Sequence, residues 1–378
     1  PFAQTKQQMG VCTTEDKKGP GSVQHVVELF NYPPEALKLS DEERKTLSKK
    51  LIKSSAPGGF APDSLTASSP ISFFQELGLM VIMGVCIGGP LVAFFLGVFI
   101  MVVGSWTANA IFFTVLAVLV LHPLPQNWDE WLCKTPLTLW MYKYFSYRIM
   151  WSGDAMDLAD ATPVWVGMAG PHGVLPFANI LSMPAIRIAL CRRFVGAAAS
   201  AVFRAPLLRY LTLFGCVDVS GASMAGALKD GCCVGMNPDG IAGIFKCSHD
   251  EEVLFLKERK GLAKFCIRNG TTVVPAYSIG NSECFHLWFD PFGIMEYLSR
   301  KLQASLFIYW GRLYLPIPRR VNVTLLIGTP IPVEQKSEQD ITSQDVDDLH
   351  NRMLASLEKV FEEHKAALGW GHKKMYFV

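Results

Sequence analysis

Residues 77–121 form a run of 45 positions without a single Asp, Glu, Lys or Arg. About 20 apolar residues cross the hydrocarbon core of a bilayer as one helix, so this run is long enough for two helices. The alternative is a buried pair of core helices in a soluble domain, which explains so long an uncharged run less well. The run therefore predicts membrane association.

The predicted membrane element is a helical hairpin within residues 71–125. Residues 104–109 offer a polar break, so we expect one helix near 77–103 and a second near 109–121. The second helix is short for a full crossing, and a transmembrane and a re-entrant hairpin both remain open. Lys residues flank the hairpin on both sides, which places both flanks in the cytosol by the positive-inside rule.

Composition narrows the class of protein further. Hydrophobic residues make up 50% of the chain and charged residues only 18%, against about 25% charged residues in ordinary soluble domains. The net charge of +2 excludes a polybasic nucleic-acid binder, so no nucleic-acid partner is expected. The ten cysteines contain no C-x-x-C pair, so we predict no metal site and a reducing compartment. No secretory signal pattern is visible near the start.

Outside the hairpin, the chain divides into a polar N-terminal region and an α/β domain. Residues 1–70 are rich in Lys, Gly, Pro and Ser, and we expect them to be largely disordered, with one helix after Ser40. Residues 126–378 carry apolar runs separated by helical patterns, which is typical of strands covered on both faces. The expected strands are 164–168, 232–236, 271–277 and 322–327, and the expected helices are 250–269 and 343–368.

The sharpest local feature is the turn Gly170-Pro171-His172-Gly173, directly after the first of these strands. A His at the end of a strand is held on rigid backbone and can face a cleft, where catalytic residues of α/β folds gather. Its near-neutral pKa in model compounds suits a general base. A turn His that merely bonds to the backbone is the competing interpretation.

Residues 174–214 interleave apolar and Arg residues. Helices that lie in the bilayer interface show this pattern, with the apolar side in the lipid and Arg at the headgroups. An ordinary packed amphipathic helix shows it too, so both interpretations stay open for this segment.

Several segments, in the same order, resemble the motifs of the type-two diacylglycerol acyltransferase family, which includes monoacylglycerol and wax-alcohol acyltransferases. Residues 165–175 resemble its His-Pro-His-Gly region, and residues 144–146 look like its Tyr-Phe-Pro motif. The other similar blocks are 202–209, 215–220, 259–265, 269–278 and 349–365. The resemblance runs from about residue 129 to residue 368.

The chain departs from the motifs of that family at four positions. The first His of the His-Pro-His-Gly region is Gly170 here, which leaves His172 as its imidazole. The Glu of a Gly-Gly-x-x-Glu segment is replaced by Gly243, a later Glu by Asn281, and the Pro of Tyr-Phe-Pro by Ser146. These departures keep open a lipid-binding member that retained the fold and lost turnover.

The resemblance implies an α/β fold: a membrane-anchored acyltransferase-like domain with a mostly parallel central sheet flanked by helices, behind the N-terminal hydrophobic hairpin. It implies transfer of a fatty acyl group from acyl-CoA to the hydroxyl of diacylglycerol, forming triacylglycerol, with monoacylglycerol or a long-chain alcohol as alternative acceptors. Acyl-CoA is then a co-substrate, and no cofactor is implied. The partners are the lipid acceptor and membrane lipids, with self-association into a homo-oligomer left open. The implied location is the endoplasmic reticulum membrane, facing the cytosol, with lipid droplets as a further site.

The reaction assigns roles to particular residues. His172 is the expected base, and because Phe177 occupies the position five residues on, where related glycerolipid acyltransferases carry an orienting carboxylate, Asp239 or Glu283 would serve instead. Backbone amides at Gly173 or Gly240 are the expected oxyanion donors. The expected substrate-binding set is Pro171, Gly173, Arg204, Arg259, Lys260, Lys264 and Arg268, in which Lys260, Lys264 and Arg268 recur every four residues as a helical stripe for the CoA phosphates. A solvated helix face is the competing interpretation of that stripe.

Overall fold

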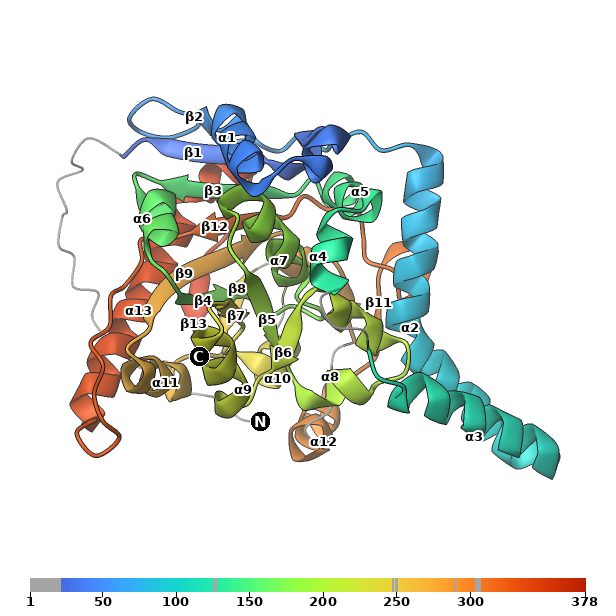
Figure 1. Ribbon diagram of the computed structural model, residues 1–378. Helices are drawn as coiled ribbons and strands as arrows, with labels where there is room; N and C mark the ends of the chain where they lie inside the picture. The colour runs from blue at the N-terminus through green and yellow to red at the C-terminus, as the bar shows by residue number, and fades with distance from the viewer. Residues whose placement is uncertain (1–21, 125–127, 247, 249–250, 289, 303–306) are drawn as a thin grey trace.

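The computed structural model describes residues 22–124, 128–246, 248, 251–288, 290–302 and 307–378. Within these residues a nine-stranded sheet has helices on both faces (Figure 1). Its strand order is β2-β1-β3-β12-β9-β4-β7-β5-β6. The strands are β1 (Gln24–Glu28), β2 (Lys53–Ser54), β3 (Arg148–Ser152), β4 (Trp165–Gly170), β5 (Phe194–Ala198), β6 (Cys216–Asp218), β7 (Cys233–Met236), β9 (Thr272–Ile279) and β12 (Thr324–Ile327).

Parallel pairing prevails around β4 in this mixed sheet. Strand β4 pairs in parallel with β7 and β9, and β5 pairs in parallel with β7 and β6. Strand β12 runs antiparallel to β9 and parallel to β3, while β1 runs antiparallel to both of its neighbours. The four strands expected from apolar runs are confirmed as β4, β7, β9 and β12, because such runs bury side chains on both faces.

Two hydrophobic clusters cover the two faces of the sheet. Helix α7 (Phe177–Leu190) lies in one cluster, and α13 (Ser343–His364), α11 (Gly261–Asn269) and α9 (Gly221–Lys229) lie in the other. Twelve of the fourteen residues of α7 are buried, so this helix is a core helix and not an interfacial one. The other helices of the domain are α4 (Trp128–Cys133), α5 (Pro136–Tyr144), α6 (Ala155–Ala161), α8 (Ser200–Arg204), α10 (Gly240–Phe245) and α12 (Ile294–Leu302).

The N-terminal region belongs to this domain from residue 22 onward, and the expectation of a largely disordered region is wrong there. Strand β1 pairs with β3 along its whole length, with Val26 in one core cluster and Val27 in the other. The sequence does not reveal that this short strand is buried on both faces, because polar residues surround its two valines. Residues 1–21 of the predicted disordered region lie outside the described residues.

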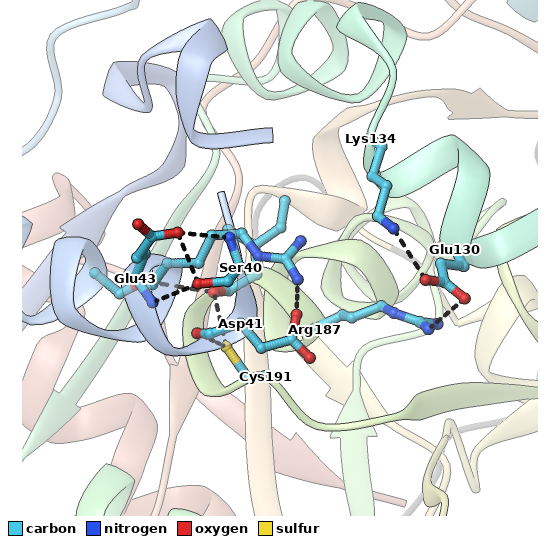
Figure 2. Close-up of polar contacts among 10 residues, drawn as sticks. Ser40, Asp41, Glu43, Glu130, Lys134, Arg187 and Cys191 are labelled. Atoms are coloured by element: carbon cyan, nitrogen blue, oxygen red, sulfur yellow. Dashed lines mark hydrogen bonds and ion pairs between the residues drawn. The ribbon is translucent and has the colours of Figure 1, made fainter. Parts of the chain in front are cut away.

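The expected helix after Ser40 is confirmed as α1 (Asp41–Leu51), which begins with a capping box between Ser40 and Glu43. Figure 2 shows how this helix meets α7: the Cys191 thiol, directly after α7, donates to the carbonyl oxygen of Asp41 at 2.8 Å. On the other side Arg187 of α7 lies 3.7 Å from Glu130 of α4. Helix α7 therefore ties both segments that flank the apolar run to the domain.

The expected helix over 250–269 is wrong in its first half. Residues Glu252–Leu254 form strand β8, which pairs in parallel with β13 (Met375–Phe377) near the C-terminus. The partner strand lies far along the sequence, so no local pattern announces it. Helix α11 occupies only the second half, Gly261–Asn269.

The apolar run forms two helices, α2 (Phe73–Val103) and α3 (Trp106–Leu121), which pack on each other. By length and composition α2 is the one described helix that could cross a membrane, and α3 is shorter. At about 1.5 Å per residue they are roughly 46 and 24 Å long. The Ser105 hydroxyl caps α3 by accepting from the amide of Ala108 at 3.2 Å.

Helix α2 changes its surroundings at Pro90. Before this residue Leu79, Met83 and Ile87 are buried against the domain, on one side of the helix. After it most large apolar side chains of α2, and of α3, are exposed. Figure 1 shows the end of α2 and all of α3 projecting away from the domain at the lower right.

Candidate active site

His172 lies just beyond the carboxyl end of β4, and Asp239 lies just beyond the carboxyl end of the neighbouring strand β7. The two strands run in parallel, so the loops after them meet at the same edge of the sheet. A cis peptide bond joins Gly170 to Pro171 ahead of His172. The structure thus brings two of the predicted catalytic residues together.

The imidazole of His172 is oriented by its own loop. Its Nδ1 lies 2.9 Å from the carbonyl oxygen of Gly173. A carbonyl oxygen can only accept, so Nδ1 carries a proton in this contact, and in the neutral ring Nε2 then keeps the lone pair. His172 is partly exposed. This tautomer leaves Nε2 as the atom that can take a proton from a substrate.

Asp239 supports the main chain of His172 and not its ring. The amide N–H of His172 donates to Asp239 Oδ2 at 3.0 Å, and Asp239 is only 1% exposed. Burial raises the pKa of Asp239, while the nearby His172 and the amide of Gly240 oppose that rise. The amide of Gly240, an expected oxyanion donor, therefore faces this carboxyl group.

Gly243 leaves the space that Asp239 occupies. A Cβ at position 243 would collide with Oδ2 of Asp239, the same oxygen that accepts from His172. Because position 243 is Gly and not Glu, the carboxyl group of Asp239 can pack directly against α10.

Asn281, which also stands in place of a Glu, clamps the loop of His172 from the strand on its other side. Its Nδ2 donates to the carbonyl oxygens of His172 at 2.7 Å and Pro171 at 3.2 Å. Its Oδ1 accepts from the amide of Ala178 at 3.1 Å, at the start of α7. A carboxylate cannot donate, so only an amide side chain makes all three of these contacts. No local sequence pattern indicates this role, because the partners of Asn281 lie about a hundred residues away along the chain.

Glu283 points into a separate buried cluster of charges. It accepts from Lys373 Nζ at 2.9 Å, and that ammonium also lies 3.8 Å from Glu252. Glu252 accepts from the hydroxyls of Tyr277 and Ser282, and burial raises its pKa to about 7. Among the described residues no hydrogen bond joins Glu283 to His172. Glu283 therefore belongs to the Lys373 cluster and is linked to the site as the second residue after Asn281.

The predicted stripe of cations is largely neutralised by acidic residues. Lys260 pairs with Asp347 at 2.8 Å, and Lys264 pairs with Glu338 at 2.8 Å. Arg268 pairs with the same Glu338 and lies near the start of β9, whereas His172 follows the end of the parallel strand β4. At about 3.3 Å per residue the two ends of β4 are roughly 17 Å apart. The stripe runs away from His172 as a solvated helix face.

Arg259 and Arg204 differ from that stripe, because no ion pair to either is found among the described residues. Arg259 lies 5.4 Å above the ring of Phe255, beside Leu254. Arg204 lines an open groove of about 610 Å³ along the edge of the sheet, together with Arg193 and Phe203. Leu254 in turn fills the space beside Gly170, where a Cβ would collide with it.

Asn237 is a further polar residue at this edge that the sequence did not single out. It directly follows β7, and both polar atoms of its side chain are buried without a hydrogen-bond partner in the described part of the chain. Oδ1 of Asp239, two residues on, is in the same condition. Buried polar atoms of this kind are rare in folded proteins, where ordered water, an ion or a bound group commonly supplies the partner.

The site is linked to α2 by a chain of aromatic contacts. Phe285, shortly after Asn281, packs on Phe177 at 6.1 Å and on Tyr309 at 5.3 Å between ring centroids. The hydroxyl of Tyr309 donates to the carbonyl oxygen of Ile87 in α2 at 3.1 Å. The loop of His172 is therefore anchored close to the point where α2 leaves the domain.

Comparison with known proteins assigns the chain to a family. The sequence profile described as "Diacylglycerol acyltransferase" matches residues 98–376. Similar curated proteins include 2-acylglycerol O-acyltransferase 3 from Homo sapiens, 28% identical over 221 residues that cover 53% of this chain and 64% of that protein. Diacylglycerol O-acyltransferase 2 from Danio rerio is 27% identical over 255 residues that cover 61% of this chain and 69% of that protein.

Among solved structures, the 1-acyl-sn-glycerophosphate (LPA) acyltransferase PlsC from Thermotoga maritima covers 78% of this chain and 98% of its own, with a TM-score of 0.38 and 13% identity. A match this distant adds nothing to the assignment. The family profile spans well over half of the residues, from within α2 to β13. The chain belongs to the diacylglycerol acyltransferase family and is an acyltransferase.

Proposed function

We propose that this acyltransferase moves a fatty acyl group from acyl-CoA to the free hydroxyl of diacylglycerol, forming triacylglycerol, with His172 as the general base. The observation that carries the proposal is the arrangement around His172. Its ring keeps Nε2 free, and its main chain is held by Asp239 on one side and Asn281 on the other. A base fixed at both its flanks on rigid strands is suited to proton transfer.

The chemistry follows from this arrangement. Nε2 of His172 removes the proton of the acceptor hydroxyl as its oxygen forms a bond to the thioester carbonyl carbon. The tetrahedral intermediate then collapses, the carbon–sulfur bond breaks, and the imidazolium returns the proton to the departing thiolate. The product ester and free CoA–SH leave the enzyme, and no electron is transferred.

The negative charge on the carbonyl oxygen of the intermediate needs donors. The amide N–H of Gly173, next to the base, is the backbone donor we assign to it. The side-chain amide of Asn237 is the second, since its Nδ2 is buried at the same sheet edge and unpaired among the described residues. The Gly240 amide is less suited because it faces the carboxyl group of Asp239.

The acceptor reaches the site from the membrane. The exposed apolar ends of α2 and α3 form a hairpin that we place in the bilayer, at the cytosolic face of the endoplasmic reticulum. The buried part of α2 joins the site through Tyr309. Neither arm after Pro90 is as long as the hydrocarbon core is thick, about 30 Å, so we favour a re-entrant hairpin.

The CoA phosphates need cations that are not already neutralised. Arg259 and Arg204 meet this requirement better than Lys260, Lys264 and Arg268, each of which has a carboxylate partner. Arg259 lies beside Phe255 on the side of the sheet edge that carries His172, and we assign the phosphates to it first.

The acceptor is tested in cells that lack neutral-lipid synthesis. The wild-type chain and His172→Ala are each expressed, and labelled acyl-CoA is followed into products with diacylglycerol, monoacylglycerol or a long-chain alcohol supplied. Labelled triacylglycerol with the wild type and none with His172→Ala supports the proposal. Product only from monoacylglycerol or the alcohol overturns the assigned acceptor, and no product from any acceptor indicates a lipid-binding member without turnover.

A further inference from the structure

Helix α12 (Ile294–Leu302) is amphipathic, but its apolar side faces outward and its polar side faces the domain, the reverse of a surface helix in a soluble domain. Its apolar side chains Ile294, Tyr297, Leu298 and Leu302 share one side of the helix, and all four are exposed, Tyr297 by 63% and Leu302 by 61%. Ser299, on the other side, is fully buried. We call these four residues the α12 surface.

The orientation of α12 is fixed by polar contacts on its inner side. The carboxylate of Asp290 accepts from the amides of Ile294 and Glu296 at 3.1 and 2.9 Å, at the start of the helix. Near its end the guanidinium of Arg300 lies 5.1 Å from the ring centroid of Phe255. The Arg300 contact and the burial of Ser299 place the polar side of α12 against the domain and leave its apolar side facing outward.

The α12 surface lies close to the catalytic loop. Helix α12 packs on α10, which directly follows Asp239, and its Arg300 stacks on the Phe255 ring that Arg259 also contacts. Phe255 in turn follows Leu254, the residue that fills the space beside Gly170. Helix α12 therefore packs on elements that border the His172 loop.

A second exposed apolar segment lies beside the start of α2. Leu313, Tyr314 and Leu315 are exposed, Tyr314 by 87%, while the neighbouring Arg312 pairs with Glu76 of α2. In Figure 1 α12 lies at the lower edge of the molecule, toward which α2 and α3 also descend. In this view the exposed apolar residues of α12 and of the hairpin thus lie toward the same edge of the molecule.

We propose that the α12 surface lies in the headgroup–acyl boundary of the bilayer and forms a second contact with lipid, beside the catalytic loop. Lipid is the occupant that the charge on this side favours, because the ammonium of Lys301 lies 6.0 Å from the ring centroid of Tyr297, as in helices that lie in a membrane interface with their cations at the headgroups. The exposed hairpin, which projects toward the same edge of the molecule in Figure 1, supports the same occupant. The inference rests on the proposed membrane function, and it adds the place where the acceptor lipid approaches the enzyme.

An environment-sensitive fluorescent amino acid, placed in the full chain, tests this contact. The protein is reconstituted in phosphatidylcholine vesicles with a minor fraction of phosphatidylserine, with the probe at position 298, at position 99 in the hairpin, or at position 344 on α13. Leu298, Phe99 and Gln344 are all exposed in the structure. We expect nitroxide lipids to quench the probe at 298. Aqueous iodide should quench the probe at 298 at least twofold less than it quenches the probe at 344.

The outcomes separate this inference from the function on which it rests. A probe at 298 that behaves like the one at 344, while the probe at 99 contacts lipid, overturns the α12 surface and leaves the hairpin intact. Probes at 298 and 99 both in water overturn the membrane placement as a whole. A probe at 298 shielded from both quenchers, with shielding that depends on protein concentration, identifies a second copy as the occupant and also overturns the inference.

A pair of charge substitutions tests the consequence for acceptor delivery. In Leu298→Glu with Leu302→Glu, the rate with diacylglycerol supplied in vesicles should fall at least fivefold, while the rate with dispersed short-chain diacylglycerol stays within twofold. Leu158→Glu, at an exposed apolar position of α6, is the matched control and should change neither rate. Equal loss with both forms of acceptor indicates damage to the fold and contradicts the inference.

Discussion

The side-chain amide of Asn281 lies 2.7 Å from the carbonyl oxygen of His172. This contact ties the residue after β9 to the residue after β4, across the two parallel strands at the centre of the sheet. It is formed by a residue that departs from the motif of the family, and it fixes the loop that carries the base.

Replacing Asn281 by Asp tests whether this contact positions the base. The variant keeps the shape and loses the donor, so a carboxylate then faces two carbonyl oxygens in a buried place. We expect kcat to fall at least tenfold and stability to drop by about 1–3 kcal/mol. Asn351→Asp, at an exposed position of α13, is the control and should leave both unchanged. Wild-type kcat in the Asn281 variant would remove this residue from the positioning of His172.

Gly243 and Gly226 form a matched pair of helix glycines. A Cβ at 226 meets nothing within 4 Å, whereas a Cβ at 243 collides with the carboxyl group of Asp239. Gly226→Ala should therefore stabilise the protein by about 0.5–1 kcal/mol, as Ala does in helices. Gly243→Ala should destabilise it and lower acyl transfer, because it displaces the acceptor of the His172 amide. Thermal unfolding in detergent with a parallel activity assay compares the two, and equal effects would contradict the account of Asp239.

The buried carboxyl group of Glu252 makes stability depend on pH. Its pKa is about 7 in the folded chain against an unfolded value of 4.5, so the folded state binds more protons between these values. Stability from this group is therefore highest below pH 4.5 and is lost as the pH rises through 7, by about 3 kcal/mol in all.

Glu252→Gln removes the titration and keeps one acceptor oxygen, so it can still accept from either Tyr277 or Ser282. The Tm of the wild type should fall more steeply than that of the variant between pH 5 and about 7.5. Parallel Tm curves for the two proteins across this range would show that Glu252 does not titrate there.

Some of the cations pair with carboxylates and others do not, among the described residues. We therefore expect substitutions in the two groups to change KM for acyl-CoA differently. Arg259→Gln should raise KM for acyl-CoA by about tenfold with a smaller change in kcat, as loss of a charge-assisted contact does. Lys264→Gln should change KM less than twofold, since its partner is Glu338. Steady-state kinetics over a range of acyl-CoA concentrations compare the two variants. A larger increase in KM for Lys264→Gln than for Arg259→Gln would contradict this assignment and place the CoA phosphates at α11.

The elements predicted correctly are those whose pattern is local. Runs such as 164–168 and 271–277 predict buried strands because apolar side chains on both faces need cover on both faces. The turn at His172 could be found in the same way, since a strand end places it at the sheet edge. The capped helix after Ser40 also follows from adjacent residues.

The elements predicted wrongly depend on distant partners. Strand β1 is a short polar-flanked segment whose place is set by β3, and β8 exists because the C-terminal strand β13 pairs with it. The stripe on α11 indicated phosphate binding because its acidic partners Asp347 and Glu338 lie far along the chain and no local pattern shows the pairing. The clamp of Asn281 likewise depends on three backbone groups that no local pattern brings together.

The central claim is that His172 acts as the base. Purified wild type, His172→Ala and His172→Gln are compared for transfer of a labelled acyl group to diacylglycerol, with binding of acyl-CoA measured on the same samples. We expect both variants to lose about 10²–10⁴-fold in kcat while acyl-CoA binding changes less than twofold. Transfer by His172→Ala within twofold of the wild type would contradict the account.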